Sequence, residues 1–151
     1  MIFAEFVTPS PSNWDILGDQ IYKIEQSIFG EESLDKEMMR SDINDPKMNL
    51  VLLKDDTSIV GFTYAVPENE ESVRIVDTVI LKEYQHRGFV SMLMSYLETE
   101  LKKGGYTYIT RDALVENGYA DKIIKNYSSR IIETKEFTSK WGKQKYFKIK
   151  L

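Results

Sequence analysis

Cysteine is absent from this 151-residue chain. Without a thiol the protein can form no disulfide and no thiolate metal site, and it cannot use a cysteine nucleophile. No stretch approaches the roughly 18 apolar residues that indicate a membrane-spanning helix. The apolar run at the amino terminus lacks the basic flank and the length of a signal peptide. We therefore expect a soluble, unprocessed protein with no membrane partner, and the lack of cysteine fits a cytoplasmic location.

Positive charge is scarce in the first 100 residues, which hold 8 Lys and Arg against 19 Asp and Glu, whereas residues 101–151 hold 12 against 5. The formal net charge is -4. Proteins that bind nucleic acid normally carry a basic face, so we expect no nucleic-acid partner. His86 is the only histidine, and no second ligand follows it at metal-site spacing, so we expect no metal.

Apolar residues at helical spacing predict four helices, each with a start or stop signal. Ser12 and Ser33 are the expected amino-terminal caps of the first two helices. The predicted ranges are 12–30, 33–43, 88–103 and 117–129.

Alternating or β-branched segments predict the strands. They cover residues 48–53, 58–66, 73–81, 106–112, 131–138 and 145–151, and the amino-terminal apolar run adds a seventh. Residues 54–57 join the strands 48–53 and 58–66 as a hairpin. The pattern contains no internal repeat, and its length suits one domain, residues 1–151, of mixed α/β class.

The most informative segment links the strand 73–81 to the helix that begins near Gly88. A helix amino terminus presents unpaired N–H groups and partial positive charge, so a turn that leads into it can bind an anion such as pyrophosphate. Gly88 would let the main chain approach the phosphates, and His86 and Arg87 would add positive charge. Neither the phosphate loop of nucleotide hydrolases nor the three-glycine dinucleotide fingerprint is present. Such a turn alone is a weak signal.

The segment Gln85-x-x-Gly88-x-Val90 resembles the Q/R-x-x-G-x-G/A pyrophosphate motif of the GCN5-related N-acetyltransferase (GNAT) family. The strand Asp77–Leu81 before it and the order of elements over nearly the whole chain agree with that family. The resemblance implies a GNAT-like fold, with a central, mostly antiparallel mixed sheet of about seven strands flanked by about four helices. Val90 departs from the motif, because the family usually has Gly or Ala there.

The resemblance also implies acetyl-CoA as the cosubstrate. The main chain of Thr78, Val79 and Ile80 would pair with the pantetheine arm as an added strand does. Asn117, which begins an N-x-x-A segment like that of the family, would contact the arm near the thioester. The residues expected to cradle the pyrophosphate are Gln85, His86, Arg87, Gly88, Phe89, Val90 and Ser91.

The position of the family's tyrosine is a second departure. It is expected seven residues past Asn117, where this chain has Ile124, and Tyr127 follows one turn later. Either the helix is one turn longer than usual or the correspondence fails. We take Tyr127 as the candidate general acid, with a packed core tyrosine as the alternative.

In this family the acceptor amine attacks the thioester directly, which requires a group to remove its proton. Asp112, at the end of the predicted strand 106–112, and Asp77 are the candidate bases; a structural hydrogen-bonding role for both, or a chain of waters, is the alternative. The acidic loop 68–71 is either a solvated tip or a group that attracts a cationic acceptor.

The predicted function is therefore acetyl transfer from acetyl-CoA to a primary amine of a small molecule or a peptide. Transfer of another acyl group is one alternative. A non-catalytic module with the same fold, which binds or senses acyl-CoA or contacts another protein, is a second. The acceptor and the oligomeric state are open, with a homodimer among the expected states.

Overall fold

Seven strands form one continuous sheet in the computed structural model, which describes all 151 residues. Their spatial order is β1-β2-β3-β4-β5-β7-β6. All neighbours are antiparallel except β4 and β5, which run parallel. The predicted mixed, mostly antiparallel sheet is thus confirmed. The strands are β1 Ile2–Val7, β2 Asn49–Asp55, β3 Ser58–Pro67, β4 Ser72–Ile80, β5 Tyr108–Leu114, β6 Ile131–Ser139 and β7 Gly142–Lys150.

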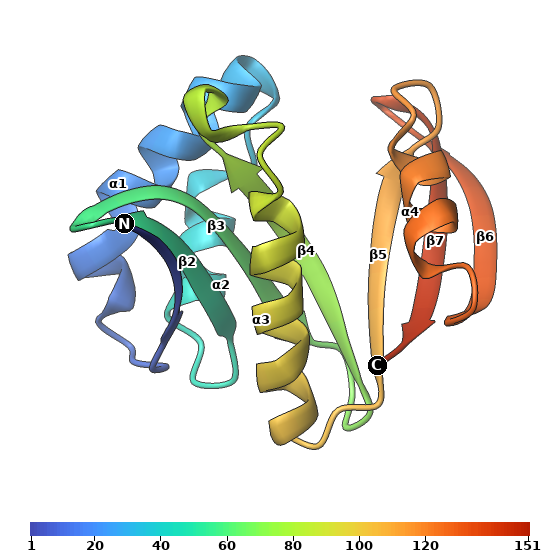
Figure 1. Cartoon of the computed structure of the whole chain (residues 1–151), viewed down its shortest axis with the longest axis horizontal. Coiled ribbons are helices and arrows are strands. Elements are labelled where there is room, and N and C mark those ends of the chain that lie inside the picture. The colour runs from blue at the N-terminus through green and yellow to red at the C-terminus, as the bar shows by residue number, and fades with distance from the viewer.

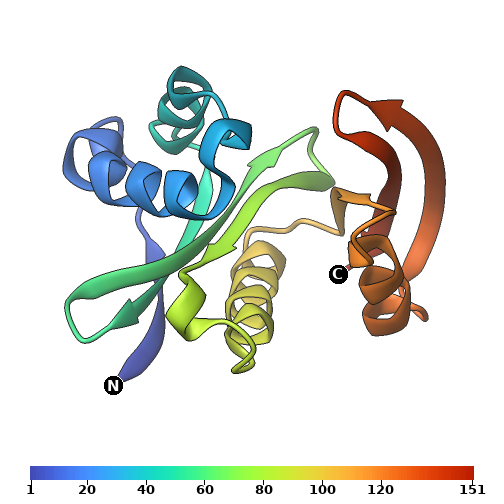
Figure 2. The ribbon, with the colours of Figure 1, turned by 90° about the horizontal axis from the view of Figure 1, so that it is seen from above.

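Four α-helices cover the two faces of the sheet, as predicted. Helices α1 and α2 lie on one face, and α3 and α4 lie on the other (Figures 1 and 2). None of these helices is both long enough and apolar enough to span a membrane. The helices are α1 Asn13–Phe29, α2 Lys36–Ile43, α3 Phe89–Lys103 and α4 Tyr119–Tyr127, and short 3₁₀ turns occupy Gly30–Glu32 and Lys82–Tyr84.

The sheet separates two apolar clusters, one under each helical layer. Phe62 and Tyr64 of β3 are fully buried against the apolar side of α1 and α2. On the opposite face, Leu93 and Leu97 of α3 are buried against the sheet together with Phe147 of β7. Each strand alternates its side chains between the two faces. The two clusters together hold the sheet between its helical layers.

The first two helices are capped differently from the prediction. The Ser12 hydroxyl lies 2.9 Å from the hydroxyl of Ser10 and makes no cap bond. Instead, the side-chain oxygen of Asn44, after α2, accepts the Trp14 amide at 2.8 Å. At α2 the cap is Asp35, whose carboxylate accepts the Met38 amide at 3.0 Å, and Ser33 donates to the carbonyl of Gly30. A partner distant in sequence thus replaces the local cap of α1.

One polar pair is buried in the layer between α1 and the sheet. The Glu25 side chain of α1 is 1% exposed, and it faces Asp77 of β4. One Glu25 oxygen accepts the Leu34 amide at 2.9 Å, but its other oxygen and the Asp77 Oδ2 have no hydrogen-bond partner. Burial and the adjacent Glu25 carboxyl raise the pKa of Asp77 well above its ordinary value. Asp77 therefore keeps its proton at neutral pH.

This pair predicts a pH-dependent effect of Asp77→Asn. Because the pKa of Asp77 is raised in the folded state, the folded protein binds more protons than the unfolded chain above about pH 4, and its stability falls as pH rises. The amide keeps a donor toward Glu25 and cannot ionise. We expect Asp77→Asn to raise the free energy of unfolding near pH 8 by at least about 1.4 kcal/mol, the cost of one pKa unit of proton uptake, because the amide needs no proton to be neutral.

Thermal melting of the variant and the wild type at pH 4.5 and pH 8 measures this effect. The gain in melting temperature should be larger at pH 8. Asp15→Asn, at an exposed position on α1, the helix that carries Glu25, is the control and should show no such difference. A variant that is less stable than the wild type at pH 8 would show that Asp77 is ionised in the fold.

Candidate active site

Strands β4 and β5 form a wedge, because they pair only at its closed end. The parallel ladder joins Ser72 to Tyr108 and ends at Arg74 and Thr110. Beyond this point the strands diverge (Figure 1), so the edge of β4 that faces β5 has no strand partner. The predicted pantetheine residues Thr78, Val79 and Ile80 lie on this unpaired part of β4. Backbone groups on such an edge are available to an extended ligand.

A β-bulge lies in β4 between the closed and the open end of the wedge. Tyr64 of β3 pairs with Asp77 while Ala65 pairs with Ile75, so Val76 is an extra residue. A bulge bends the strand and changes the direction of its side chains. Ile75 packs in the cluster beneath α3, whereas Asp77 faces α1. The Asp77 carboxyl therefore points into the α1 layer and not along the wedge.

The open end of the wedge leads to the amino terminus of α3, as the motif predicts. Gly88 adopts a left-handed conformation with φ of 81°, and no side chain caps the helix. The amides of Phe89, Val90 and Ser91 have no intrahelical acceptor because they are the first of the helix. The first turn also contains no acidic residue that would repel an anion. Free amides at the positive end of a helix dipole are suited to bind an anion, and we refer to this start of α3 as the anion site. No atom lies within 4 Å of the place where a Gly88 Cβ would be, so the main chain is open to a ligand.

Of the side chains around the start of α3, Gln85 holds the loop in place, whereas His86, Arg87 and Val90 are exposed. The amide of Gln85 donates to the carbonyl of Ile80 at 2.9 Å, which fastens the loop to the end of β4. The Arg87 guanidinium lies 5.2 Å from the ring centroid of Phe89 and is exposed, as is His86. Val90 is 52% exposed, so its branched side chain faces solvent and lies outside the apolar cluster under α3.

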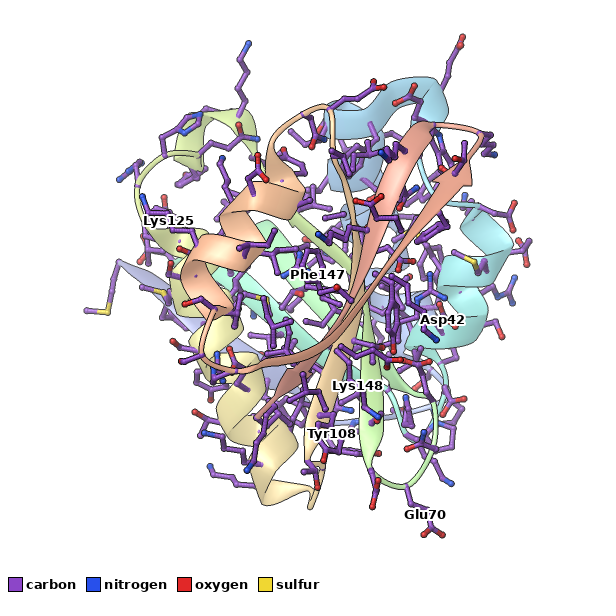
Figure 3. All side chains as sticks on the ribbon, turned by 90° about the vertical axis from the view of Figure 1, so that its right-hand side faces the viewer. Asp42, Glu70, Tyr108, Lys125, Phe147 and Lys148 are labelled. Atoms are coloured by element: carbon purple, nitrogen blue, oxygen red, sulfur yellow. The ribbon has the colours of Figure 1, made fainter.

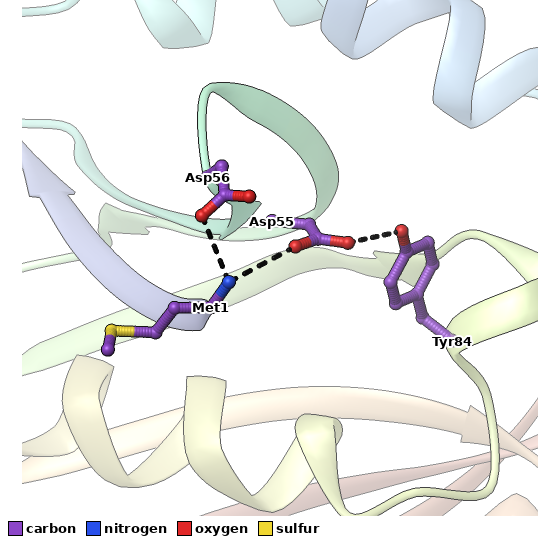
Figure 4. Close-up of polar contacts among 4 residues, drawn as sticks. All are labelled: Met1, Asp55, Asp56 and Tyr84. Atoms are coloured by element: carbon purple, nitrogen blue, oxygen red, sulfur yellow. Dashed lines mark hydrogen bonds and ion pairs between the residues drawn. The ribbon is translucent and has the colours of Figure 1, made fainter.

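A second set of contacts holds the start of this loop. Tyr84, in the 3₁₀ turn, donates its hydroxyl proton to Asp55 at 2.8 Å. The Met1 ammonium group lies 3.6 Å from the same carboxylate and 2.9 Å from that of Asp56 (Figure 4). This network joins the loop to the turn between β2 and β3. The network thus holds the 3₁₀ turn that leads into the loop against the turn between β2 and β3.

Asn117 and Gly118 precede α4 at the other side of the open end. The side-chain oxygen of Asn117 accepts the Tyr119 amide at 3.0 Å, and Gly118 is left-handed with φ of 82°. Helix α4 therefore begins two residues later than predicted. The N-cap residue is Gly118, which has no side chain to cap the helix, so the Asn117 oxygen one residue earlier takes the first helical amide. The Asn117 Nδ2 group has no protein partner and is available to a ligand.

Tyr127 is the last residue of α4 and lies near the closed end of the wedge. It is half-buried against the cluster under α3, whereas Ile124 one turn earlier is exposed. The Arg130 guanidinium lies 4.9 Å from the Tyr127 ring centroid and binds Glu98 of α3 at 2.6 Å. Burial and Glu98 raise the pKa of Tyr127, and Arg111 and Arg130 oppose this rise. Of the two candidate positions, Tyr127 is the one that faces inward.

Asp112 lies on the opposite face of the sheet, toward α1 and α2. Its carboxylate is 3.3 Å from the Arg74 guanidinium. Burial and nearby Glu68 raise the pKa of Asp112, and Arg74 lowers it. Glu68 itself accepts a hydrogen bond from Thr110. A cavity of about 50 Å³ lies here, lined by Glu68, Arg74, Thr110, Arg111, Asp112 and Tyr146.

An acidic groove continues from this cavity along the loop between β3 and β4. Asp42 and Glu70 both lie on this side of the molecule, at the right of Figure 3. The groove has a volume of about 740 Å³ and also takes in Asp45, Glu68 and Lys47. Glu68 bridges the loop to β5, so the acidic loop is anchored at that residue and is not wholly a solvated tip.

Sequence reasoning missed four charged residues of this region: Glu25, Glu98, Arg111 and Arg130. Arg111 could have been found, because it lies midway between Ile109 and Ala113, two buried positions of the same strand face. A charge in phase with buried residues indicates a special role. The other three come from helices or turns distant in sequence from their partners, and no local pattern identifies them.

No group of three His, Asp or Glu side chains is arranged to hold a metal ion. The candidate site consists of three parts: the backbone amides at the start of α3, the unpaired edge of β4, and ionisable side chains on both faces of the sheet.

Similar folds occur among solved structures. Ard1 from Thermoplasma volcanium superposes with a TM-score of 0.76 at 14% identity, over 98% of this chain and 97% of that chain. A GNAT family acetyltransferase from Elizabethkingia anophelis with acetyl-CoA bound gives 0.67 at 14% identity, over 99% and 98%. The ribosomal-protein-S18-alanine N-acetyltransferase from Escherichia coli gives 0.72 at 15% identity, over 99% and 93%.

Among curated proteins no sequence matches. The profile of the acetyltransferase (GNAT) family, however, matches residues 18–123, which include the wedge, the anion site at α3 and the start of α4. The chain belongs to the acetyltransferase (GNAT) family.

Proposed function

We propose that this protein transfers the acetyl group of acetyl-CoA to a primary amine by direct attack on the thioester. One observation carries the proposal: the free amides at the start of α3 lie at the open end of the unpaired β4 edge. An extended ligand with an anionic group at one end fits this arrangement. Coenzyme A has this form, with a pyrophosphate followed by a pantetheine arm that contains two amides.

The pyrophosphate would bind the amides of residues 88–91, with Arg87 and His86 nearby. The pantetheine arm would pair with the main chain of Thr78 and Val79, because the Ile80 carbonyl already accepts the Gln85 amide. The free Nδ2 group of Asn117 would donate to the arm from the β5 side. The thioester then lies near the bulge at Val76.

The two candidate proton-transfer groups lie on opposite faces of the sheet. Asp112 faces the cavity on the α1 and α2 side, and Tyr127 lies between α3 and α4. The amine would approach from the Asp112 side and form the C–N bond as the C–S bond breaks. Asp112 would take the amine proton, and Tyr127 would give a proton to sulfur. Asp77 is the weaker candidate base, because it is protonated and faces Glu25.

The acidic groove supports an acceptor that carries positive charge. Asp42, Asp45, Glu68 and Glu70 line the groove that leads to Asp112, and Lys47 is its only basic residue. A polyamine, an aminoglycoside or a basic peptide would be attracted along it. Because the same charges raise the local concentration of protonated amines, a base at the inner end is needed to release the attacking nitrogen.

Coenzyme binding is tested by thermal melting. Acetyl-CoA at 100 times its Kd should stabilise the protein by about 2.7 kcal/mol. Gly88→Val should abolish the shift, since a β-branched residue is strained at φ of 81° and its side chain would occupy the approach to the amides. Gly105→Val is the matched control, because Gly105 has φ of 87° at the far end of α3. It should melt lower but keep the shift. An unchanged wild-type melting temperature at millimolar acetyl-CoA contradicts the proposal.

Tyr127→Phe tests the general acid. The variant loses only the phenolic proton, so we expect normal folding, an unchanged coenzyme shift and turnover lowered roughly 10-fold or more. Turnover is followed as free thiol released from acetyl-CoA with a panel of amines: spermidine, kanamycin, a lysine-containing peptide and free amino acids. Tyr96→Phe, at an exposed position of α3, is the control. Wild-type turnover in Tyr127→Phe would leave sulfur protonation to water. Binding of acetyl-CoA without turnover of any amine would favour the non-catalytic alternative.

Asp112→Asn tests the base, and Arg74→Met tests its environment. Asp112→Asn should lower kcat roughly 10-fold or more and remove the acidic limb of the pH profile. Because Arg74 lowers the pKa of Asp112, Arg74→Met should move that limb to higher pH. The limb that belongs to the acceptor amine should stay in place. A profile that is the same in Arg74→Met and the wild type would show that Asp112 is not the titrating base.

A further inference from the structure

Arg111 is a charged side chain without a protein partner in the interior of the wedge. Its residue pairs with Phe147 of β7, and it shares a strand face with Ile109 and Ala113, which are both buried beneath α3 and α4. The Nε atom is buried and has no hydrogen-bond acceptor. The guanidinium makes no ion pair, although the structure contains nine ion pairs elsewhere.

The ionisable groups whose charges act on Arg111 form no ion pair with it. They are Glu98 of α3 and Tyr127 of α4. Glu98 is already bound to Arg130 at 2.6 Å. The Glu98 carboxylate is therefore taken by Arg130, and the positive charge of Arg111 has no ion-pair partner between α3 and α4. A partly buried charge without a partner is costly, and an anionic group bound next to it would offset that cost.

The position of Arg111 in the strand identifies which anion. It is the first residue of β5 beyond Thr110, where the ladder to β4 ends, so it lies at the inner end of the wedge. The pyrophosphate would be at the opposite, open end near Gly88. The charge of Arg111 acts on Tyr127 and is acted on by Glu98, which places the guanidinium toward α3 and α4, although Arg111 also lines the cavity that Asp112 lines. The group that gains negative charge on this side is the sulfur that leaves.

We propose that Arg111 supplies the positive charge that stabilises the coenzyme A sulfur as it leaves, an inference that rests on the proposed acetyl transfer. The amine lone pair forms the C–N bond, and the electron pair of the C–S bond moves to sulfur. Arg111 balances this charge until the Tyr127 proton reaches the thiolate. A preorganised charge of this kind acts where the transition state becomes anionic. It also accounts for the lack of a protein partner in the resting enzyme.

The test titrates the thiol of bound coenzyme A and needs no acceptor amine. Wild type, Arg111→Met, Arg111→Lys and the control Arg40→Met are saturated with coenzyme A, and the thiolate is followed by its ultraviolet absorbance against pH. A positive charge within a few ångströms lowers the pKa of an acid by about 1–3 units. We expect this lowering, relative to free coenzyme A, in the wild type, in Arg40→Met and, in larger part, in Arg111→Lys. In Arg111→Met the pKa should return toward the free value.

Turnover provides a second readout that a purely structural role would not produce. Arg111→Met should lower kcat roughly 10-fold and leave KM for acetyl-CoA nearly unchanged, because the interaction forms only as sulfur becomes charged. If Arg111→Met does not fold, Arg111→Lys and Arg111→Gln are compared with the wild type in the same titration.

Two results would overturn the role of Arg111 while leaving the proposed function intact. One is a bound thiol pKa equal to that of free coenzyme A in the wild type, or equal in the wild type and a folded neutral variant. The other is a preference for succinyl-CoA over acetyl-CoA that Arg111→Met abolishes, because the guanidinium would then bind an acyl carboxylate. Absence of any melting shift with coenzyme A contradicts the proposed function itself.

Discussion

The parallel ladder between β4 and β5 contains only three residue pairs, and the candidate site depends on this short length. Parallel strands are joined by a crossover, and here α3 supplies it and places its amino terminus at the end of β4 where the strands have separated. Had the ladder continued to Ile80, the β4 edge would be closed and the helix amides would face a complete sheet. The anion site and the strand edge therefore arise together from one interruption in hydrogen bonding.

The end of the β4–β5 ladder also determines which ionisable side chains lie next to the wedge. Beyond Thr110, successive β5 residues place Arg111 on one face and Asp112 on the other, and both are close to the wedge. The carboxylate of Asp112 pairs with Arg74, whereas the Arg111 guanidinium forms no ion pair, although the two residues are neighbours in sequence. No ion pair joins Arg111 to Asp112, so both charges remain in the region between the strands.

Local patterns in the sequence were sufficient for the elements and for the anion loop. Gly88 and the periodic apolar residues of α3 identify a turn that feeds a helix, and the structure has this turn with the conformation that glycine favours. Contacts between distant segments were not visible in the same way. Asn44 caps α1 in place of Ser12, and Glu25 approaches Asp77 only after α1 packs on the sheet. The left-handed Gly118 likewise delays the start of α4 past the predicted Asn117, and no periodicity records this.

The polar contacts between the two halves of the sheet are gathered at the closed end of the wedge. Glu68 meets Thr110, Arg74 meets Asp112, and Glu98 meets Arg130, while no ladder joins β4 to β5 farther out. The part formed by β5, β7, β6 and α4 is thus joined to the rest of the protein mainly at the closed end of the wedge. For two parts joined at one end, a small rotation about the joined end changes the distance between them most at the opposite end. The open end is therefore the part of the wedge whose width depends least on direct contacts between the two halves, and the region around Asp112 and Tyr127 is the part that those contacts hold.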